Sequence, residues 1–205
     1  DNLWVGTFHG LAHRLLRRHW QDAGLPQSFQ ILDSEDQQRL IRRLLRSLEL
    51  DENTWVPREI QWFINAQKDE GRRADDLRDE GDSHRRELIN LYRVYQDACE
   101  RSGLVDFAEL LLRAQELWLN NPELLESYRR RFRHVLVDEF QDTNAIQYAW
   151  LRLLIGSSGV PFAVGARALI ELLDAIAVAG GGHLGVAGEA DDQHLRGLFR
   201  HQDRP

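Results

Sequence analysis

The sequence has little of what marks several protein classes. Only one of its 205 residues is cysteine, Cys99, so an internal disulfide framework is excluded and a reducing compartment is expected. No apolar run approaches the ~20 residues of a membrane span, and the first residues lack the basic region and apolar core of a signal peptide. We therefore expect a soluble cytoplasmic protein with no membrane partner.

Other patterns that would point to a function are also missing. The sequence has no Gly-x-x-x-x-Gly-Lys-[Ser/Thr] phosphate loop, whose backbone amides and lysine hold nucleotide phosphates. Its eight histidines are scattered without the spacing of a helix-borne metal site, which argues against a histidine-based metal hydrolase. A net charge of -7 argues against a generic basic nucleic-acid-binding tail, although arginines can still cluster locally.

What is present indicates a globular, mainly helical chain of one or two domains. Hydrophobic residues make up 42% of the chain and charged residues 29%. Residues 68–83 are charged and punctuated by glycine, which predicts an exposed connection between helices. Strands are predicted at 3–5, 134–137 and 160–165, and amphipathic helices near 11–20, 34–48, 57–64, 84–101, 107–118, 122–128 and 144–155.

Residues 134–144 (HVLVDEFQDTN) carry the clearest chemical signal. Four strand-forming residues lead into Asp138 and Glu139, which predicts a buried strand that presents two acids at a sheet edge, where α/β folds bind ligands. In a Walker-B arrangement the first acid holds hydrated Mg²⁺ and the second orients or deprotonates the attacking water. The plainer alternative is an acidic turn after an ordinary strand, with Thr143 or Asn144 capping the next helix.

The longer motifs resemble one family. Residues 137–144 (VDEFQDTN) resemble motif II of the UvrD/Rep-type superfamily 1 DNA helicases. Residues 5–10 (VGTFHG) resemble the early DNA-contact motif of that family, and 103–111 (GLVDFAELL) resemble a second element. The resemblance covers about three quarters of the chain. It implies a fragment of an α/β P-loop NTPase (RecA-like) motor domain with a mainly α-helical insertion, mostly α overall.

The resemblance also implies a domain order. Residues 1–20 would be part of the RecA-like domain 1A, so that the chain begins inside a domain, and 21–105 would be the helical domain 1B. Residues 106–165 would return to domain 1A with motif II. From Ala166 the sequence departs from the family pattern, so we expect 166–205 to be an atypical tail, non-native or rearranged. A reading-frame slip and a recombined or engineered junction would each explain that departure.

The function implied by the resemblance is that of an ATP-dependent 3′-to-5′ DNA helicase of repair or replication. Its cofactors would be ATP and Mg²⁺, and its partners would be single-stranded DNA, junctions of single- and double-stranded DNA, and DNA-repair proteins. Asp138 would hold Mg²⁺ with the nucleotide, Glu139 would polarise the catalytic water, and Gln141 would bind and sense the γ-phosphate as part of the catalytic group.

Five residues would contact single-stranded DNA by the same resemblance: Thr7, Phe8, His9, Asp106 and Phe107. Helix capping by Thr7 or Asp106 and a core position for Phe8 are the plainer alternatives. Two other functions remain open, a non-catalytic helical DNA-binding or interaction module and a helicase-nuclease subunit. Because the phosphate loop is missing, we expect that this chain alone neither hydrolyses ATP at a useful rate nor unwinds DNA.

Overall fold

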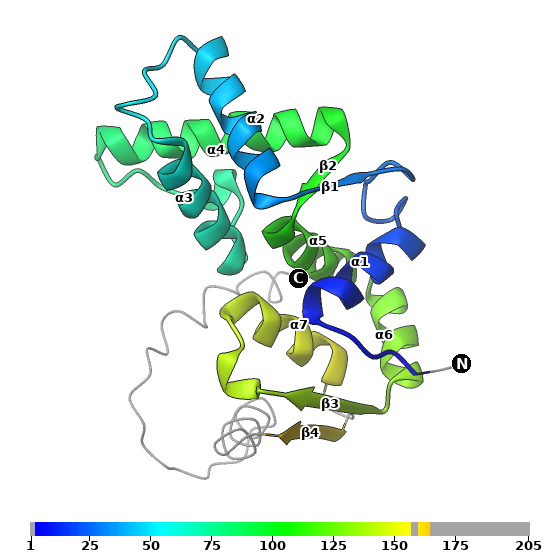
Figure 1. Ribbon diagram of the computed structural model, residues 1–205. Helices are drawn as coiled ribbons and strands as arrows, with labels where there is room; N and C mark the ends of the chain where they lie inside the picture. Colours follow the sequence, from blue (N-terminus) through cyan, green and yellow to red (C-terminus); the bar gives the residue numbers. More distant parts are fainter. Residues whose placement is uncertain (1–2, 157–159, 165–205) are drawn as a thin grey trace, which may run out of the picture. The chain divides into compact units, whose positions relative to one another are not determined.

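A computed structural model describes residues 3–156 and 160–164 (Figure 1). Within them the chain is mostly helical and carries two small parallel sheets, which confirms the prediction of a mainly helical chain. The chain divides into two compact units, one from Leu3 to Leu117 and one that begins at Trp118.

The first unit contains most of the helices. They are α1 (Phe8–Arg18), α2 (Ser34–Ser47), α3 (Pro57–Asp69), α4 (Ser83–Ser102) and most of α5 (Phe107–Asn120), with a 3-10 turn, η1 (Ala74–Asp76). Two short strands, β1 (Gln30–Leu32) and β2 (Leu104–Asp106), pair in parallel, with Leu32 opposite Asp106. The sequence did not predict this pair, because three residues are too few to show a strand's alternating pattern.

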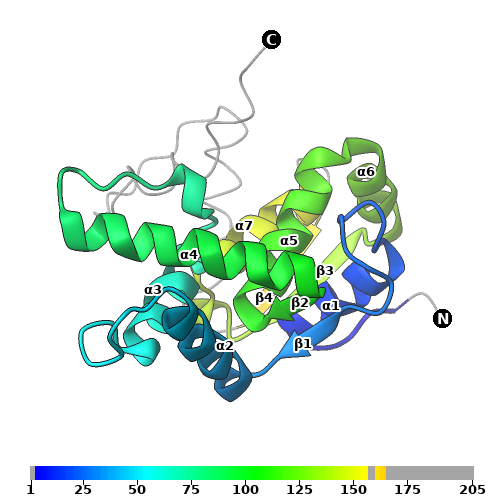
Figure 2. The ribbon, with the colours of Figure 1, turned by 90° about the horizontal axis from the view of Figure 1, so that it is seen from above.

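The core of this unit lies between α2, α3 and α4. Figure 2 shows α2 and α3 along one side of the long α4. Each helix presents apolar residues at three- and four-residue spacing, so one face of each is buried. The largest contributions come from Ile41, Leu45, Ile60, Ile64, Leu91, Tyr92 and Tyr95.

Local sequence signals set the helix ends. As predicted, α4 ends at Gly103, which adopts the left-handed conformation with φ +63°. Ser34 followed three residues later by Gln37 is a sequence pattern that predicts a capping box. This prediction is wrong by one residue, because Asp33 is the cap and its Oδ1 accepts the Asp36 N–H at 2.7 Å. Gln37 instead turns inward, where it is buried and donates to Asn65 Oδ1 at 2.9 Å.

Two other expectations for this unit are wrong. Residues 3–5 are not a strand, and Leu3 and Val5 are 78% and 81% exposed. A strand needs a partner for its backbone groups, and none pairs with this segment within the described residues. The connection after residue 68 is not wholly exposed either, because Lys68 and Ala74 are buried.

The second unit is built around a parallel strand pair. Its elements are α6 (Pro122–Arg131), β3 (His134–Asp138), a 3-10 turn η2 (Phe140–Asp142), α7 (Ala145–Ile155) and β4 (Val160–Val164). β3 and β4 pair from His134 opposite Val160 to Asp138 opposite Val164, as their predicted strand character required. Helices α6 and α7 pack on each other, and Trp150 of α7 stacks on Trp118 with ring centroids 4.6 Å apart.

β3 is less buried than the sequence predicted. Val137 is buried, but Leu136 is 73% exposed, because β3 has a single partner strand within the described residues. The predicted division into 1–20, 21–105 and 106–165 stays a prediction, since compactness does not show to which family domain a segment belongs. The tail at 166–205 lies outside the described residues.

Gly103 offers a test of the close contact between the end of α4 and Pro26. A Cβ at Gly103 would lie 2.7 Å from Pro26 Cγ, whereas a Cβ at Gly81, which has φ +87°, would meet nothing within 4 Å. Alanine at either position costs about 1–2 kcal/mol for the left-handed backbone. We expect Gly103→Ala to lose roughly another 1–3 kcal/mol through the clash. Urea denaturation of both variants measures the difference, and equal midpoints would contradict the contact.

Candidate nucleic-acid interface and nucleotide site

The first candidate site begins at the N-terminus of α1. Thr7 is the cap of this helix, and its Oγ1 accepts the Gly10 N–H at 3.2 Å. The cap was the plainer of the two roles considered for Thr7, and it leaves the residue exposed to solvent. The first N–H groups of a helix have no partner inside it, so this end of α1 favours an anion.

His9 and Phe107 lie together at this surface. Their rings meet edge to face, with centroids 6.0 Å apart and an interplanar angle of 85°. Phe107, the first residue of α5, is 50% exposed, and Phe8 and His9 are half-buried. The structure thus brings together residues from two distant motifs, one in each of the first and fifth helices.

The protonation of His9 is set by its surroundings. Partial burial of the imidazole lowers the pKa of His9 below its ordinary value, and the negative charge of Asp69 opposes part of that lowering. At neutral pH the ring is therefore uncharged, and it offers a hydrogen bond and a flat surface rather than a positive charge.

Asp106 is not at the surface. It is 2% exposed, and its Oδ2 accepts from Lys68 Nζ at 2.6 Å and from the Tyr95 hydroxyl at 2.7 Å. Its Oδ1 accepts the Glu109 N–H at 2.8 Å, so the predicted cap of α5 is confirmed. A direct contact of Asp106 with DNA stays a prediction that this burial does not support.

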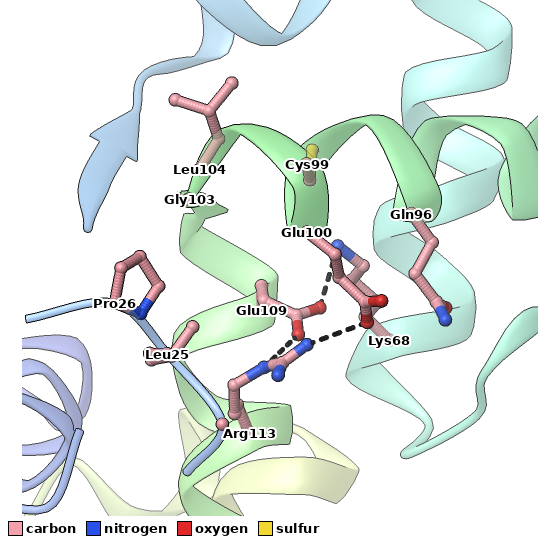
Figure 3. Close-up of a pocket in the computed structure, with 11 residues that line it drawn as sticks. Leu25, Pro26, Lys68, Gln96, Cys99, Glu100, Gly103, Leu104, Glu109 and Arg113 are labelled. Carbon is pink, nitrogen blue, oxygen red and sulfur yellow. Dashed lines mark hydrogen bonds and ion pairs between the residues drawn. The ribbon is translucent and has the colours of Figure 1, made fainter. Parts of the chain in front are cut away.

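A buried ionic cluster surrounds Asp106. We call the following residues the ionic cluster: Lys68, Arg73, Tyr95, Asp106, Glu109, Arg113 and Glu116. Glu109 lies at its centre, 3.0 Å from Lys68 Nζ and 2.8 Å from both Arg73 and Arg113 (Figure 3 shows the Lys68 and Arg113 contacts). Burial alone would raise the pKa of Glu109, but these three cations hold it well below its usual range.

The cluster is a structural site and not a ligand pocket. The cavity beside it measures about 20 Å³ and is lined by Lys68, Gln96, Cys99 and Glu109 among others (Figure 3). That volume admits about one water molecule, which excludes a base or a nucleotide. Burial raises the pKa of the Cys99 thiol to about 12, so this cysteine is unreactive, as a small buried apolar residue would be.

Sequence reasoning missed this cluster. It placed Lys68 in an exposed segment because the neighbouring residues are charged. One signal could have indicated burial: Lys68 follows Ile60 and Ile64 at four-residue spacing, so it lies on the buried face of α3. Tyr95, the other side-chain donor to Asp106 Oδ2 at under 3 Å, lies on the buried face of α4.

The second candidate site is the end of β3. Asp138 is the last residue of the strand and is exposed, and its Oδ1 accepts the Glu139 N–H at 3.0 Å. Glu139 is also exposed and has φ +51°, a left-handed conformation that is uncommon outside glycine. The chain therefore turns sharply here and leaves two neighbouring carboxylates at the carboxyl end of a parallel strand.

The residues after the two acids hold this turn in place. Phe140 is buried and meets Tyr148 edge to face, at a centroid distance of 6.2 Å. Asn144 and Gln147 form a reciprocal capping box at the start of α7, with bonds of 3.0 and 3.1 Å. Asn144 is thus the cap, one of the two residues predicted for it. The side chain of Gln141 lies outside the described residues.

The two acids fit a magnesium ion that is completed by a nucleotide. Within the described residues no ion pair neutralises Asp138, and no group of three or more histidine, cysteine or acidic side chains gathers to enclose a metal. Mg²⁺ is commonly held by one or two carboxylates together with phosphates and water.

Among the helices that the structure describes, none is long and apolar enough to cross a membrane.

Comparison with known proteins shows to which family the chain belongs. A family model for the UvrD/REP helicase N-terminal domain matches residues 1–167. DNA helicase II of Salmonella typhimurium and that of Escherichia coli K12 are each 61% identical over 163 residues, 80% of this chain and 23% of the relative. The ATP-dependent DNA helicase PcrA of Leuconostoc citreum is 36% identical over 154 residues, 75% of this chain and 21% of that protein.

The chain thus spans less than a quarter of the length of these relatives. The matched residues include the cap and His9 of α1, the start of α5 and the acidic end of β3. The resemblance expected from three short motifs is therefore confirmed: the chain belongs to the UvrD/REP helicase family, and residues 1–167 match its N-terminal domain.

Proposed function

We propose that this chain is a part of an ATP-dependent 3′-to-5′ DNA helicase of repair or replication, and that it carries a surface for single-stranded DNA. The observation that carries the proposal is the contact between His9 and Phe107 at the first turns of α1 and α5. A half-exposed aromatic ring gives a base a face to stack on, which is the usual basis of sequence-independent binding to single strands.

The surroundings of that pair suit a nucleic-acid backbone. The N-terminus of α1 offers N–H groups to a phosphate, and the exposed hydroxyl of Thr7 lies at the same end. A chain with net charge -7 would therefore bind DNA through a local surface.

The nucleotide part of the proposal concerns the end of β3. Within a complete P-loop, RecA-like motor, Asp138 would hold Mg²⁺, Glu139 would polarise the water and Gln141 would sense the γ-phosphate. The metal would supply charge stabilisation for the transferred phosphoryl group. The exposed, adjacent carboxylates and the capped turn behind them support these roles.

A non-catalytic DNA-binding module is the second candidate for the chain by itself. The absence of a phosphate loop from the sequence favours it, because ATP would have no backbone cradle. The proposed DNA-repair partners and the DNA junctions belong to the whole helicase, of which this chain covers a part.

Single-stranded DNA binding should depend on His9 and Phe107. We expect Phe107→Ala to lose about 1–3 kcal/mol of binding free energy, the range for removing one stacked base contact. We expect His9→Ala to weaken binding as well. Fluorescence polarisation of a labelled oligonucleotide across a salt series measures both, and the affinity of the parent chain should fall as salt rises.

His84→Ala is the matched control for His9→Ala. His84 also lies in the first turn of a helix and contacts an aromatic ring, since it stacks on Trp55 with centroids 4.7 Å apart. Because its ring partner is Trp55, which belongs to neither DNA-contact motif, its removal should leave the affinity unchanged. Equal losses for the two histidine variants would refute the assigned surface.

DNA binding should strengthen as the pH falls below about 6.5, the ordinary pKa of histidine, because the lowered pKa of His9 places its protonation on that side. His9 is uncharged at higher pH because its pKa is lowered, and protonation would place a positive charge beside a phosphate. His9→Gln should abolish a few-fold gain that His84→Gln retains. The folding stability of the chain should change in the other direction. Because the pKa of His9 is lowered in the folded state, the free energy of unfolding should decrease as the pH falls. An identical pH profile for parent and His9→Gln would exclude this role.

The purified chain should show no DNA-stimulated release of phosphate from ATP. The physical reason is the missing phosphate loop, without which the acids of β3 have no bound nucleotide to act on. A coupled phosphate assay with Mg²⁺ and single-stranded DNA tests this, with Asp138→Asn/Glu139→Gln as the background control. Activity above that control would overturn the expectation.

A further inference from the structure

We propose that the ionic cluster is a positioning device for the DNA-contact pair of His9 and Phe107, acting through Lys68 and Tyr95 on Asp106. The inference rests on the proposed function, because it concerns the geometry of the same DNA surface. Neither Lys68 nor Tyr95 can touch DNA, since both are buried.

Asp106 is fixed from four helices. It accepts from Lys68 of α3 at 2.6 Å, from Tyr95 of α4 at 2.7 Å, from Gln37 of α2 at 3.5 Å and from the backbone of α5 at 2.8 Å. The bonds from Lys68 and Tyr95, at 2.6 and 2.7 Å to an ionised acceptor in a buried site, are strong and directional. The carboxylate therefore has one orientation available to it.

That orientation sets the direction of Phe107. Asp106 ends β2, caps α5 and directly precedes Phe107, so its backbone and side chain define how α5 begins. The pairing of Asp106 with Leu32 fixes the other side of the same residue. A shift of the carboxylate would tilt the first turn of α5 and move the Phe107 ring away from His9.

The last turn of α3 reaches both members of the pair. Lys68 binds Asp106, one residue before Phe107, and the next residue, Asp69, acts electrostatically on His9. The last turn of α3 is thus bonded to the residue that precedes Phe107, and its next carboxylate lies near enough to His9 to act on the charge of the imidazole.

Tyr95→Phe is the sharpest test, because it removes one hydrogen bond to Asp106 and keeps the ring. Tyr92→Phe is the matched control: Tyr92 is equally buried on α4, but its hydroxyl donates to the Arg72 carbonyl at 3.0 Å and not to Asp106. Lys68→Met is a stronger variant, used if circular dichroism shows that it folds. Each is combined with Phe107→Ala in a double-mutant cycle of single-stranded DNA affinity.

We expect Tyr95→Phe to weaken DNA binding roughly threefold to tenfold when Phe107 is present, and to have no effect in the Phe107→Ala background. Tyr92→Phe should leave the affinity unchanged at a comparable loss of thermal stability. An equal effect of Tyr95→Phe with and without Phe107, or no effect at all, would overturn the proposal.

A second measurement separates positioning from DNA binding itself. With 4-fluorophenylalanine at position 107, the fluorine resonance of the DNA-free chain should shift in Tyr95→Phe and stay in place in Tyr92→Phe. If the fluorine resonance is the same in Tyr95→Phe as in the parent chain, the positioning role is overturned even if DNA binds. A parent chain that binds no single-stranded DNA, whatever the resonance does, overturns the proposed function and this inference with it.

Discussion

The first unit depends on the mutual neutralisation of buried charges. Three cations, Lys68, Arg73 and Arg113, face three carboxylates, those of Asp106, Glu109 and Glu116. Lys68, Asp106 and Glu109 are buried, and an isolated charge there would cost several kcal/mol, so each of these three requires its partners. Arg73, Arg113 and Glu116 are partly exposed and surround them. The partners come from α3, β2, α5 and the segment between α3 and α4, so their pairing constrains how these segments are arranged. Apolar packing of α2, α3 and α4 is non-directional, whereas the bonds of the ionic cluster have fixed partners and directions.

This constraint links the interior to the surface. Asp106 takes part in the ionic cluster and is also the cap from which α5 and Phe107 begin. A core built of leucine alone would tolerate small rotations of α5, since apolar contacts have little directional preference. Short charge-assisted bonds do not tolerate them. The proposed DNA surface depends on the relative direction of the His9 and Phe107 rings. Directional bonds to Asp106 would hold that direction better than apolar contacts would.

Local features of the fold were predictable from the sequence, and non-local ones were not. Three helix ends follow from single residues: α4 ends at Gly103, α6 begins at Pro122 and α7 is capped by Asn144. The glycine and the proline act through their backbone preferences, and the asparagine acts through its side chain. The strand expected at 3–5 is absent, because a strand exists only with a partner that a local pattern cannot supply. The burial of Lys68 was missed for the same reason: its partner Asp106 is 38 residues away in the chain. Of the proposed DNA residues, the sequence could group Thr7 to His9, but only the fold brings Phe107 to them.

The acidic end of β3 shows how much of a site a short segment can build by itself. The turn that presents Asp138 and Glu139 is held by the buried ring of Phe140 and by the capping box of α7, all within the same stretch of chain. None of these contacts requires a bound nucleotide. The left-handed backbone at Glu139 is unfavourable for that residue, and the contacts that follow it in the chain offset its cost. The geometry of the two acids is thus set by the strand, the turn and the helix around them, which is why so short a motif can be recognised in sequence.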